Sequence, residues 1–268
     1  MIQKVALSRT VGETYRICIQ SKTPVIITDV FSVLPNLKKW DLDYASRKIA
    51  EKETVVLQGS TEEQSGGWTR TVMRTSEYFK RIKNGFNNGP LMYMAQQNIE
   101  ETHPELLPLI EFDQLIPKNV VRQRIFWLGP GGTRAPLHMD PDDNFFIQLM
   151  GVKTFHLFSP DDTPYLYAHS PRSNSPELSQ VKACDIDRAA YPKTIFAKAI
   201  QVDIKPGEIL FLPAYWWHEV VNGPENSISI NLWCHTKFIG NLNGMKQLMP
   251  KKIKSALSSL FHFSPKIH

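Results

Sequence analysis

The sequence has 268 residues, of which 42% are hydrophobic and 21% charged, and its formal net charge is +5. This length and composition suit a globular chain with one large core or two small ones, and 14 glycines and 19 prolines are too few for a fibrous or low-complexity protein. No apolar run approaches the ~20 residues that span a bilayer, no secretory signal opens the sequence, and three scattered cysteines indicate neither a disulfide framework nor a thiolate zinc site. We therefore expect a cytoplasmic or nuclear protein without a membrane partner.

The first 120 residues alternate short strand patterns with helical patterns. Runs of apolar and β-branched residues predict strands at residues 24–28, 54–57 and 91–95. Helical spacing of apolar residues, with suitable start and stop residues, predicts helices at residues 40–50, 75–85 and 103–110.

From about residue 122 the pattern changes to many short strands separated by turn residues. The predicted strands cover residues 122–128, 133–139, 144–150, 153–158, 199–204, 208–212, 216–221 and 227–233. Strands at such close spacing favour a β-sandwich or barrel over an array of alternating strands and helices. Residues 160–192 are polar and contain several prolines and serines, which predicts a long insertion loop of the kind that is often functional.

The end of the sequence carries the excess positive charge. Six lysines and no acidic residue follow Glu225, so residues 1–226 hold 25 basic and 26 acidic side chains and sum to −1. Apolar residues at helical spacing predict an amphipathic helix over residues 250–261. A solvated helical face is the commoner explanation of such a tail, and contact with nucleic acid or an acidic partner is the alternative.

A histidine and an aspartate two residues apart form the most informative motif. Because side chains two apart on a strand point to the same face, His138 and Asp140 are expected to face one point. His218, at the end of a predicted strand pair, is the best candidate for a third ligand. Two histidines and one carboxylate on one side of a metal are typical of non-haem Fe(II) oxygenases. A zinc hydrolase also fits this ligand set, and an isolated His-x-Asp pair often only hydrogen-bonds its neighbours.

Further motifs surround these residues. They are FWLGPGGT at 126–133, PLHMD at 136–140, NFFIQ at 144–148, GVK at 151–153, LFSP at 157–160, PGEILFLP at 206–213 and INLW at 230–233. Together they resemble the JmjC/cupin-like 2-oxoglutarate oxygenases over roughly residues 24–236. In motif the sequence is similar to the JmjC-only hydroxylases, namely the asparaginyl hydroxylase that inhibits hypoxia-inducible factor and the arginyl and tRNA-wybutosine hydroxylases.

The resemblance implies a mainly β fold with flanking helices, the double-stranded β-helix or jelly-roll of cupin and JmjC proteins. It implies one oxygenase domain over residues 1–236, with an α/β flank at 1–120 and a jelly-roll core at 121–236. Residues 237–268 would follow this domain as a basic helical tail.

The resemblance also implies roles for individual residues in a reaction that uses Fe(II), 2-oxoglutarate and O2. The catalytic and metal-binding residues would be His138, Asp140 and His218, and the cosubstrate-binding residues Lys153, Tyr93, Asn144 and Asn231. Lys153 matches the family lysine that pairs with the distal carboxylate of 2-oxoglutarate, which suits a buried ammonium that needs an anionic partner. Ala135 departs from the pattern, because close relatives have serine or threonine there. The loss of one neutral hydrogen bond costs ~0.5–1.5 kcal/mol, so this departure leaves the chemistry intact and the choice of cosubstrate open.

The substrate is the least determined part of this prediction. Candidate substrate-contacting residues are Gln96, Trp233, Arg122 and Arg124. The resemblance favours hydroxylation of a peptide or protein side chain. Alternatives are a modified tRNA nucleoside, bound with help from the basic tail, a small molecule, or a non-catalytic cupin-like module that only binds metal or ligand. The C-terminal helix is expected to pair two subunits in a homodimer.

Overall fold

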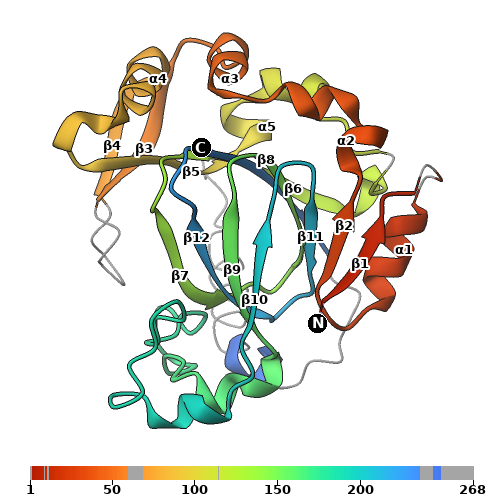
Figure 1. Ribbon diagram of the computed structural model, residues 1–268, viewed down its shortest axis with the longest axis vertical. Coiled ribbons are helices and arrows are strands. Elements are labelled where there is room, and N and C mark those ends of the chain that lie inside the picture. The colour runs from red at the N-terminus through yellow and green to blue at the C-terminus, as the bar shows by residue number, and fades with distance from the viewer. Residues whose placement is uncertain are drawn as a thin grey trace, which may run out of the picture.

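The computed structural model describes residues 2–8, 10, 12–59, 69–113, 115–235 and 244–248. Two β-sheets form the jelly-roll that the sequence predicted (Figure 1). The larger sheet has nine strands in the order β1-β2-β11-β8-β13-β6-β5-β3-β4, and the smaller has four in the order β10-β9-β12-β7. Within these residues no helix has the length and apolar composition needed to cross a membrane.

Strands β6 to β9 alternate between the two sheets, which is the winding of a jelly-roll. The larger sheet consists of β1 (Gln3–Ala6), β2 (Val25–Thr28), β3 (Glu53–Gly59), β4 (Thr69–Arg74), β5 (Leu91–Asn98), β6 (Val121–Gly129), β8 (Asp143–Met150), β11 (Ile209–Leu212) and β13 (Ser227–Cys234). The smaller sheet consists of β7 (Arg134–Met139), β9 (Lys153–Phe158), β10 (Ile200–Ile204) and β12 (Trp217–Asn222). The eight strands predicted from residue 122 onward correspond to β6 to β13.

Strand β8 lies inside the larger sheet and is covered on both faces. Phe145 and Ile147 belong to the core formed with the helices outside the barrel. Phe146 points into the barrel, where its ring centroid lies 4.8 Å from that of Phe155 on β9. A strand covered on both faces needs apolar residues at successive positions, which explains why this run lacks polar alternation.

Short helices lie around the outside of the larger sheet in Figure 1. They are the α-helices α1 (Glu13–Gln20), α2 (Val30–Val33), α3 (Leu42–Lys48), α4 (Thr75–Lys83) and α5 (Ile99–Thr102), and the 3-10 helices η1 (Pro35–Lys39), η2 (Gly85–Asn88), η3 (Pro104–Leu109) and η4 (Lys118–Val120). The helices predicted at residues 40–50, 75–85 and 103–110 correspond to α3, α4 and η3. The helix predicted at residues 250–261, and with it the predicted dimer contact, lies outside the described residues.

The segment between β9 and β10 folds back along β7, the edge strand of the smaller sheet. It contains the 3-10 helices η5 (Pro160–Tyr165) and η6 (Pro192–Phe196) and lies at the bottom of the view in Figure 1. The backbone N–H of Met139 donates to the carbonyl oxygen of Glu177 at 3.0 Å, and that of Ser179 donates to Leu137 at 2.9 Å. The predicted insertion loop therefore covers the edge of the strand that carries His138.

A buried ion pair fastens this insertion to the barrel. The Glu219 carboxylate on β12 is fully buried and lies 2.8 Å from the guanidinium of Arg134 on β7. The same carboxylate accepts hydrogen bonds from the backbone N–H groups of Ala183 at 3.1 Å and Cys184 at 2.7 Å. Three charge-assisted hydrogen bonds thus meet at one carboxylate, which makes it a strong attachment point.

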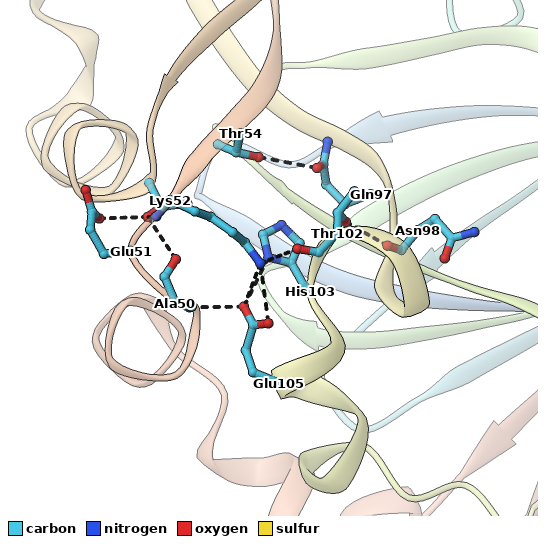
Figure 2. Close-up of polar contacts among 10 residues, drawn as sticks. Ala50, Glu51, Lys52, Thr54, Gln97, Asn98, Thr102, His103 and Glu105 are labelled. Carbon is cyan, nitrogen blue, oxygen red and sulfur yellow. Dashed lines mark hydrogen bonds and ion pairs between the residues drawn. The ribbon is translucent and has the colours of Figure 1, made fainter.

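A second polar network links the start of β3 to η3 and β5 (Figure 2). The Lys52 ammonium lies 3.1 Å from the Glu105 carboxylate, which also accepts a hydrogen bond from the backbone N–H of Ala50. Two residues after Lys52, on β3, the Thr54 hydroxyl donates to the side-chain carbonyl oxygen of Gln97 on β5. The network joins the start of β3 to η3 through Glu105 and to β5 through Gln97.

Candidate metal centre

His138 on β7 and His218 on β12 lie opposite each other, because the two antiparallel strands pair with these residues in register. Their ring centroids are 4.0 Å apart. Asp140 directly follows β7, and its Oδ2 lies 3.7 Å from Nε2 of His218. One donor atom from each residue lies within 4.8 Å of the other two, so the fold brings the three predicted ligands to one point.

The hydrogen bonds of both imidazole rings leave the same nitrogen available. Nδ1 of His138 lies 2.6 Å from the carbonyl oxygen of Pro136, and Nδ1 of His218 lies 3.0 Å from that of Trp216. Because a carbonyl oxygen only accepts, each Nδ1 carries a proton, and in the neutral ring Nε2 presents its lone pair. Backbone partners of this kind fix the tautomer and orientation of metal-binding histidines. The donor set therefore fits a divalent transition metal.

Burial keeps His218 neutral and works against ionisation of Asp140. Burial, and then the neighbouring His138 ring, lower the pKa of His218 well below its usual value. Burial also raises the pKa of Asp140, while His138 and Arg122 act in the opposite direction. A cation bound between the three side chains would favour the ionised aspartate and the neutral imidazole, which are the forms that bind metals.

Lys153 is a buried lysine that forms no ion pair with any carboxylate of the described chain. Its exposed fraction is 3%, and its Nζ donates to the hydroxyls of Ser229 at 2.9 Å and Tyr93 at 3.3 Å. The ammonium also lies over the rings of Phe146 and Trp127, at 5.2 Å and 5.8 Å from their centroids. Burial lowers the pKa of Lys153 to about 7. The site therefore lacks the counter-charge that an anionic ligand would supply.

A cavity of about 380 Å³ joins the three candidate metal ligands to Lys153. Asn144 and Asn231 line it, and the side-chain amide of Asn231 donates to that of Asn144 at 3.1 Å. The Oδ1 of Asn231 is buried and has no hydrogen-bond partner in the described structure, so it is available to a ligand or a water molecule. Ala135 also lines the cavity, with a methyl group where the resemblance led us to expect a hydroxyl.

Two residues beside Lys153 were not among the predicted site residues. Ser229 accepts the shorter of the two lysine hydrogen bonds. It lies two residues before Asn231 on β13, so strand alternation from the predicted asparagine would have found it. Trp127 lines the cavity, and its buried Nε1 has no partner within the described residues. Its position in the predicted strand gave no sign of this, because an apolar core role accounts equally well for a tryptophan.

A bulge in β5 places two consecutive residues on the cavity wall. The pairing register of β5 with β6 shifts between Met94 and Gln97, and Gln96 has a left-handed backbone with φ of 52°. Successive side chains of a regular strand point to opposite faces, yet Ala95 and Gln96 both line the cavity. The Gln97 carboxamide holds the bulge by donating to the carbonyl oxygens of Ala95 at 2.9 Å and Val55 at 3.0 Å.

The remaining predicted substrate residues lie in different surroundings. Trp233 lines the cavity together with Gln96. Arg122 and Arg124 are not among the residues that line it, and they form ion pairs with Asp142 at 2.9 Å and Glu100 at 2.6 Å. The structure therefore brings Gln96 and Trp233 to the candidate site and gives the two arginines acidic neighbours instead.

Comparison with known proteins identifies related chains. A family model described as a cupin-like domain matches residues 12–239. Lysine-specific demethylase 8 of Danio rerio is 29% identical over 218 residues, which are 79% of this chain and 53% of the relative. The protein of the same name from Xenopus tropicalis is 30% identical over 218 residues, 78% of this chain and 47% of the relative. HSPB1-associated protein 1 of Homo sapiens is 34% identical over 114 residues, 42% of this chain and 23% of the relative. The chain thus spans about half the length of the two demethylase relatives.

Proposed function

The chain belongs to the family of cupin-like domains, and from this premise we propose that it is an Fe(II)- and 2-oxoglutarate-dependent oxygenase. The observation that carries the proposal is one cavity that contains both a two-histidine, one-aspartate cluster and the buried ammonium of Lys153. A zinc hydrolase uses similar ligands, but it gives no reason to bury a lysine without a carboxylate beside it.

In this proposal His138, Asp140 and His218 bind the metal through one face and leave its other positions open. The metal and cosubstrate, when bound, supply the oxidation of a substrate C–H bond by O2, with conversion of 2-oxoglutarate to succinate and carbon dioxide. The chain's own residues bind, orient and shield the reactants. Lys153 binds the distal carboxylate, and Tyr93, whose hydroxyl already accepts from the lysine, donates its own proton to the same group.

The absence of a hydroxyl at Ala135 is compatible with cosubstrate binding. A neutral hydrogen bond contributes ~0.5–1.5 kcal/mol, whereas a buried charge pair loses ~3–5 kcal/mol when one partner is removed. Lys153 therefore dominates recognition of the distal carboxylate, and the Ser229 and Tyr93 hydroxyls beside it support the same role.

We propose that the substrate is a peptide or protein side chain. Gln96 and Trp233 combine an amide and an aromatic ring on the cavity wall, which suits an amphipathic side chain. The names of two relatives favour a second candidate reaction, the removal of a methyl group from lysine. The same oxidation at an N-methyl carbon would achieve this, because the resulting hydroxymethyl amine releases formaldehyde.

The proposal is tested by succinate formation from 2-oxoglutarate by the purified chain with Fe(II). We expect turnover that stops without iron and that Asp140→Ala abolishes. Equal succinate formation by the wild type and this variant would contradict the assignment. Peptides from a lysate treated with the enzyme then separate the two reactions: a mass gain of one oxygen atom indicates hydroxylation, and loss of a methyl group with formaldehyde release indicates demethylation.

A further inference from the structure

Residues 244–248 lie within the segment expected to be a basic helical tail, and they form a helix that packs against the barrel. Leu248 is 4% exposed and Gln247 is 8% exposed. The side-chain amide of Gln247 donates to the carbonyl oxygens of His169 at 2.6 Å and Pro176 at 2.8 Å. Both acceptors belong to the insertion that covers β7, so directional hydrogen bonds fix this segment beside the candidate metal centre.

The beginning of the same segment presses against Tyr215. A Cβ on Gly244 would lie 2.3 Å from the Cβ of Tyr215, a separation that no side chain tolerates. Tyr215 itself has a left-handed backbone with φ of 68°, which is unfavourable for a residue with a side chain and persists only where its surroundings enforce it. The backbone N–H of Tyr215 donates to the carbonyl oxygen of Asp140 at 2.7 Å. Tyr215 thus links Gly244, which it contacts, to the main chain of the candidate ligand Asp140, to which it is hydrogen-bonded.

The segment also packs behind both histidines. Leu248 and Met245 join a hydrophobic cluster that includes Leu137 and Met139, the residues on either side of the first histidine, and Trp217, which precedes the second. Because strand neighbours point to opposite faces, this cluster fills the side of β7 and β12 that faces away from the imidazole rings. Both candidate histidine ligands therefore rest on a layer to which residues 244–248 contribute.

We propose that residues 244–248 are a positioning element of the metal centre: they hold Tyr215 in its left-handed conformation and thereby fix the main chain of Asp140. The inference rests on the proposed function, since it concerns the metal site that the oxygenase requires. Partners outside the ligand set typically change metal affinity by about 10–100-fold when they are mutated. By linkage, metal binding must in turn stabilise the packed position of the segment.

The test uses Co(II), whose visible spectrum reports the geometry of its ligands, with the full chain. Gly244→Ala adds the Cβ that meets Tyr215, so we expect Co(II) affinity to fall by about tenfold or more, with an altered spectrum. Lys246→Ala changes an exposed side chain of the same segment and should bind as the wild type does. Ile82→Ala removes a buried side chain of the other core, and should lower stability without altering the Co(II) spectrum.

A compensating variant distinguishes the effect of the contact between residues 244 and 215 from a general loss of stability. In Gly244→Ala with Tyr215→Gly the clash disappears, and glycine adopts the left-handed backbone without strain. We expect this double variant to bind Co(II) more tightly than Gly244→Ala alone, and equal or weaker binding overturns the inference. A wild type that binds no Co(II) refutes the metal centre itself and the inference with it. A wild type that binds, with an unchanged affinity and spectrum in Gly244→Ala, refutes the positioning role alone.

If Gly244→Ala does not fold, hydrogen exchange of the wild type tests whether residues 244–248 are coupled to metal binding. In the wild type, Co(II) should slow exchange of the backbone amides of residues 244–248, because metal binding and the packed segment stabilise each other. Exchange of this segment that is the same with and without Co(II) overturns the inference.

Discussion

Replacement of Lys153 by methionine is expected to stabilise the ligand-free protein at neutral pH. Burial lowers the lysine pKa from 10.5 to about 7, and this difference of about 3.5 corresponds to a cost of about 4–5 kcal/mol at ~1.4 kcal/mol per pKa unit. Methionine has a similar length and no charge, but it loses the hydrogen bonds to Ser229 and Tyr93, each contributing ~1 kcal/mol. The net expectation is a gain of about 2–3 kcal/mol in the free energy of unfolding.

The gain should depend on pH in a defined direction. Because the folded-state pKa of Lys153 lies below the unfolded-state value of 10.5, the unfolded chain binds more protons between about pH 7 and pH 10.5. Wild-type stability therefore rises with pH across this window, and the advantage of Lys153→Met is largest below it and fades toward its upper end. Urea unfolding of both proteins near the two limits measures the difference. A variant less stable than the wild type at about pH 7, or an advantage that stays constant with pH, refutes the reasoning.

The same substitution should have the opposite effect on cosubstrate binding. Removal of one partner of a buried charge pair costs ~3–5 kcal/mol, so the affinity of metal-loaded Lys153→Met for 2-oxoglutarate should fall by more than about a hundredfold. Calorimetric titration measures this loss. A variant that is destabilised and binds poorly would indicate general damage, whereas a stabilised variant that binds poorly shows that the lysine is kept for the ligand.

Three further substitutions probe the walls of the site. Ala135→Ser should tighten 2-oxoglutarate binding by up to about tenfold through one added hydrogen bond. An unchanged dissociation constant would show that a hydroxyl at this position does not reach the cosubstrate. Gln97→Met should lower the free energy of unfolding by ~1–3 kcal/mol in urea denaturation, because the carbonyl oxygens of Ala95 and Val55 lose the hydrogen bonds from the Gln97 carboxamide. A variant as stable as the wild type would show that Gln97 does not hold the bulge. Glu219→Gln should lower the free energy of unfolding by ~3–5 kcal/mol in the same assay, because the buried guanidinium of Arg134 loses its counter-charge. A decrease below ~1 kcal/mol, the scale of one hydrogen bond, would show that the ion pair contributes little.

The barrel could be predicted because its strands are short, apolar and separated by strong turn residues. The period of two along a strand also gave the relation of His138 to Asp140. The position of His218 opposite His138 results from pairing between strands that are 80 residues apart in sequence, and local patterns do not contain that register. His218 was chosen because it ends a predicted strand pair, and the motif resemblance then assigned it the same role.

Features that depend on tertiary contacts were beyond local patterns. The bulge at Ala95 and Gln96 exists because two residues of β5 oppose one of β6, which the sequence of β5 alone does not encode. The attachment of the insertion to Glu219 joins an ordinary acidic residue to backbone N–H groups of a loop without periodicity. Arg122 and Arg124 illustrate the same limit, since alternation on a strand face does not reveal the acidic residues with which they pair.

The charges of the cavity give a physical reason for its two ligands to bind together. With Asp140 ionised, Lys153 protonated and both histidines in the neutral form that binds metals, the site has a formal charge of zero. A divalent cation alone would leave two uncompensated positive charges in a buried space, and a dicarboxylate alone two negative ones, whereas both together restore neutrality. We therefore expect 2-oxoglutarate to increase the affinity for Mn(II), and Mn(II) to increase that for 2-oxoglutarate by the same factor. A Mn(II) titration with and without the dicarboxylate measures this coupling, and equal dissociation constants in the two titrations would show that the two ligands do not share the site.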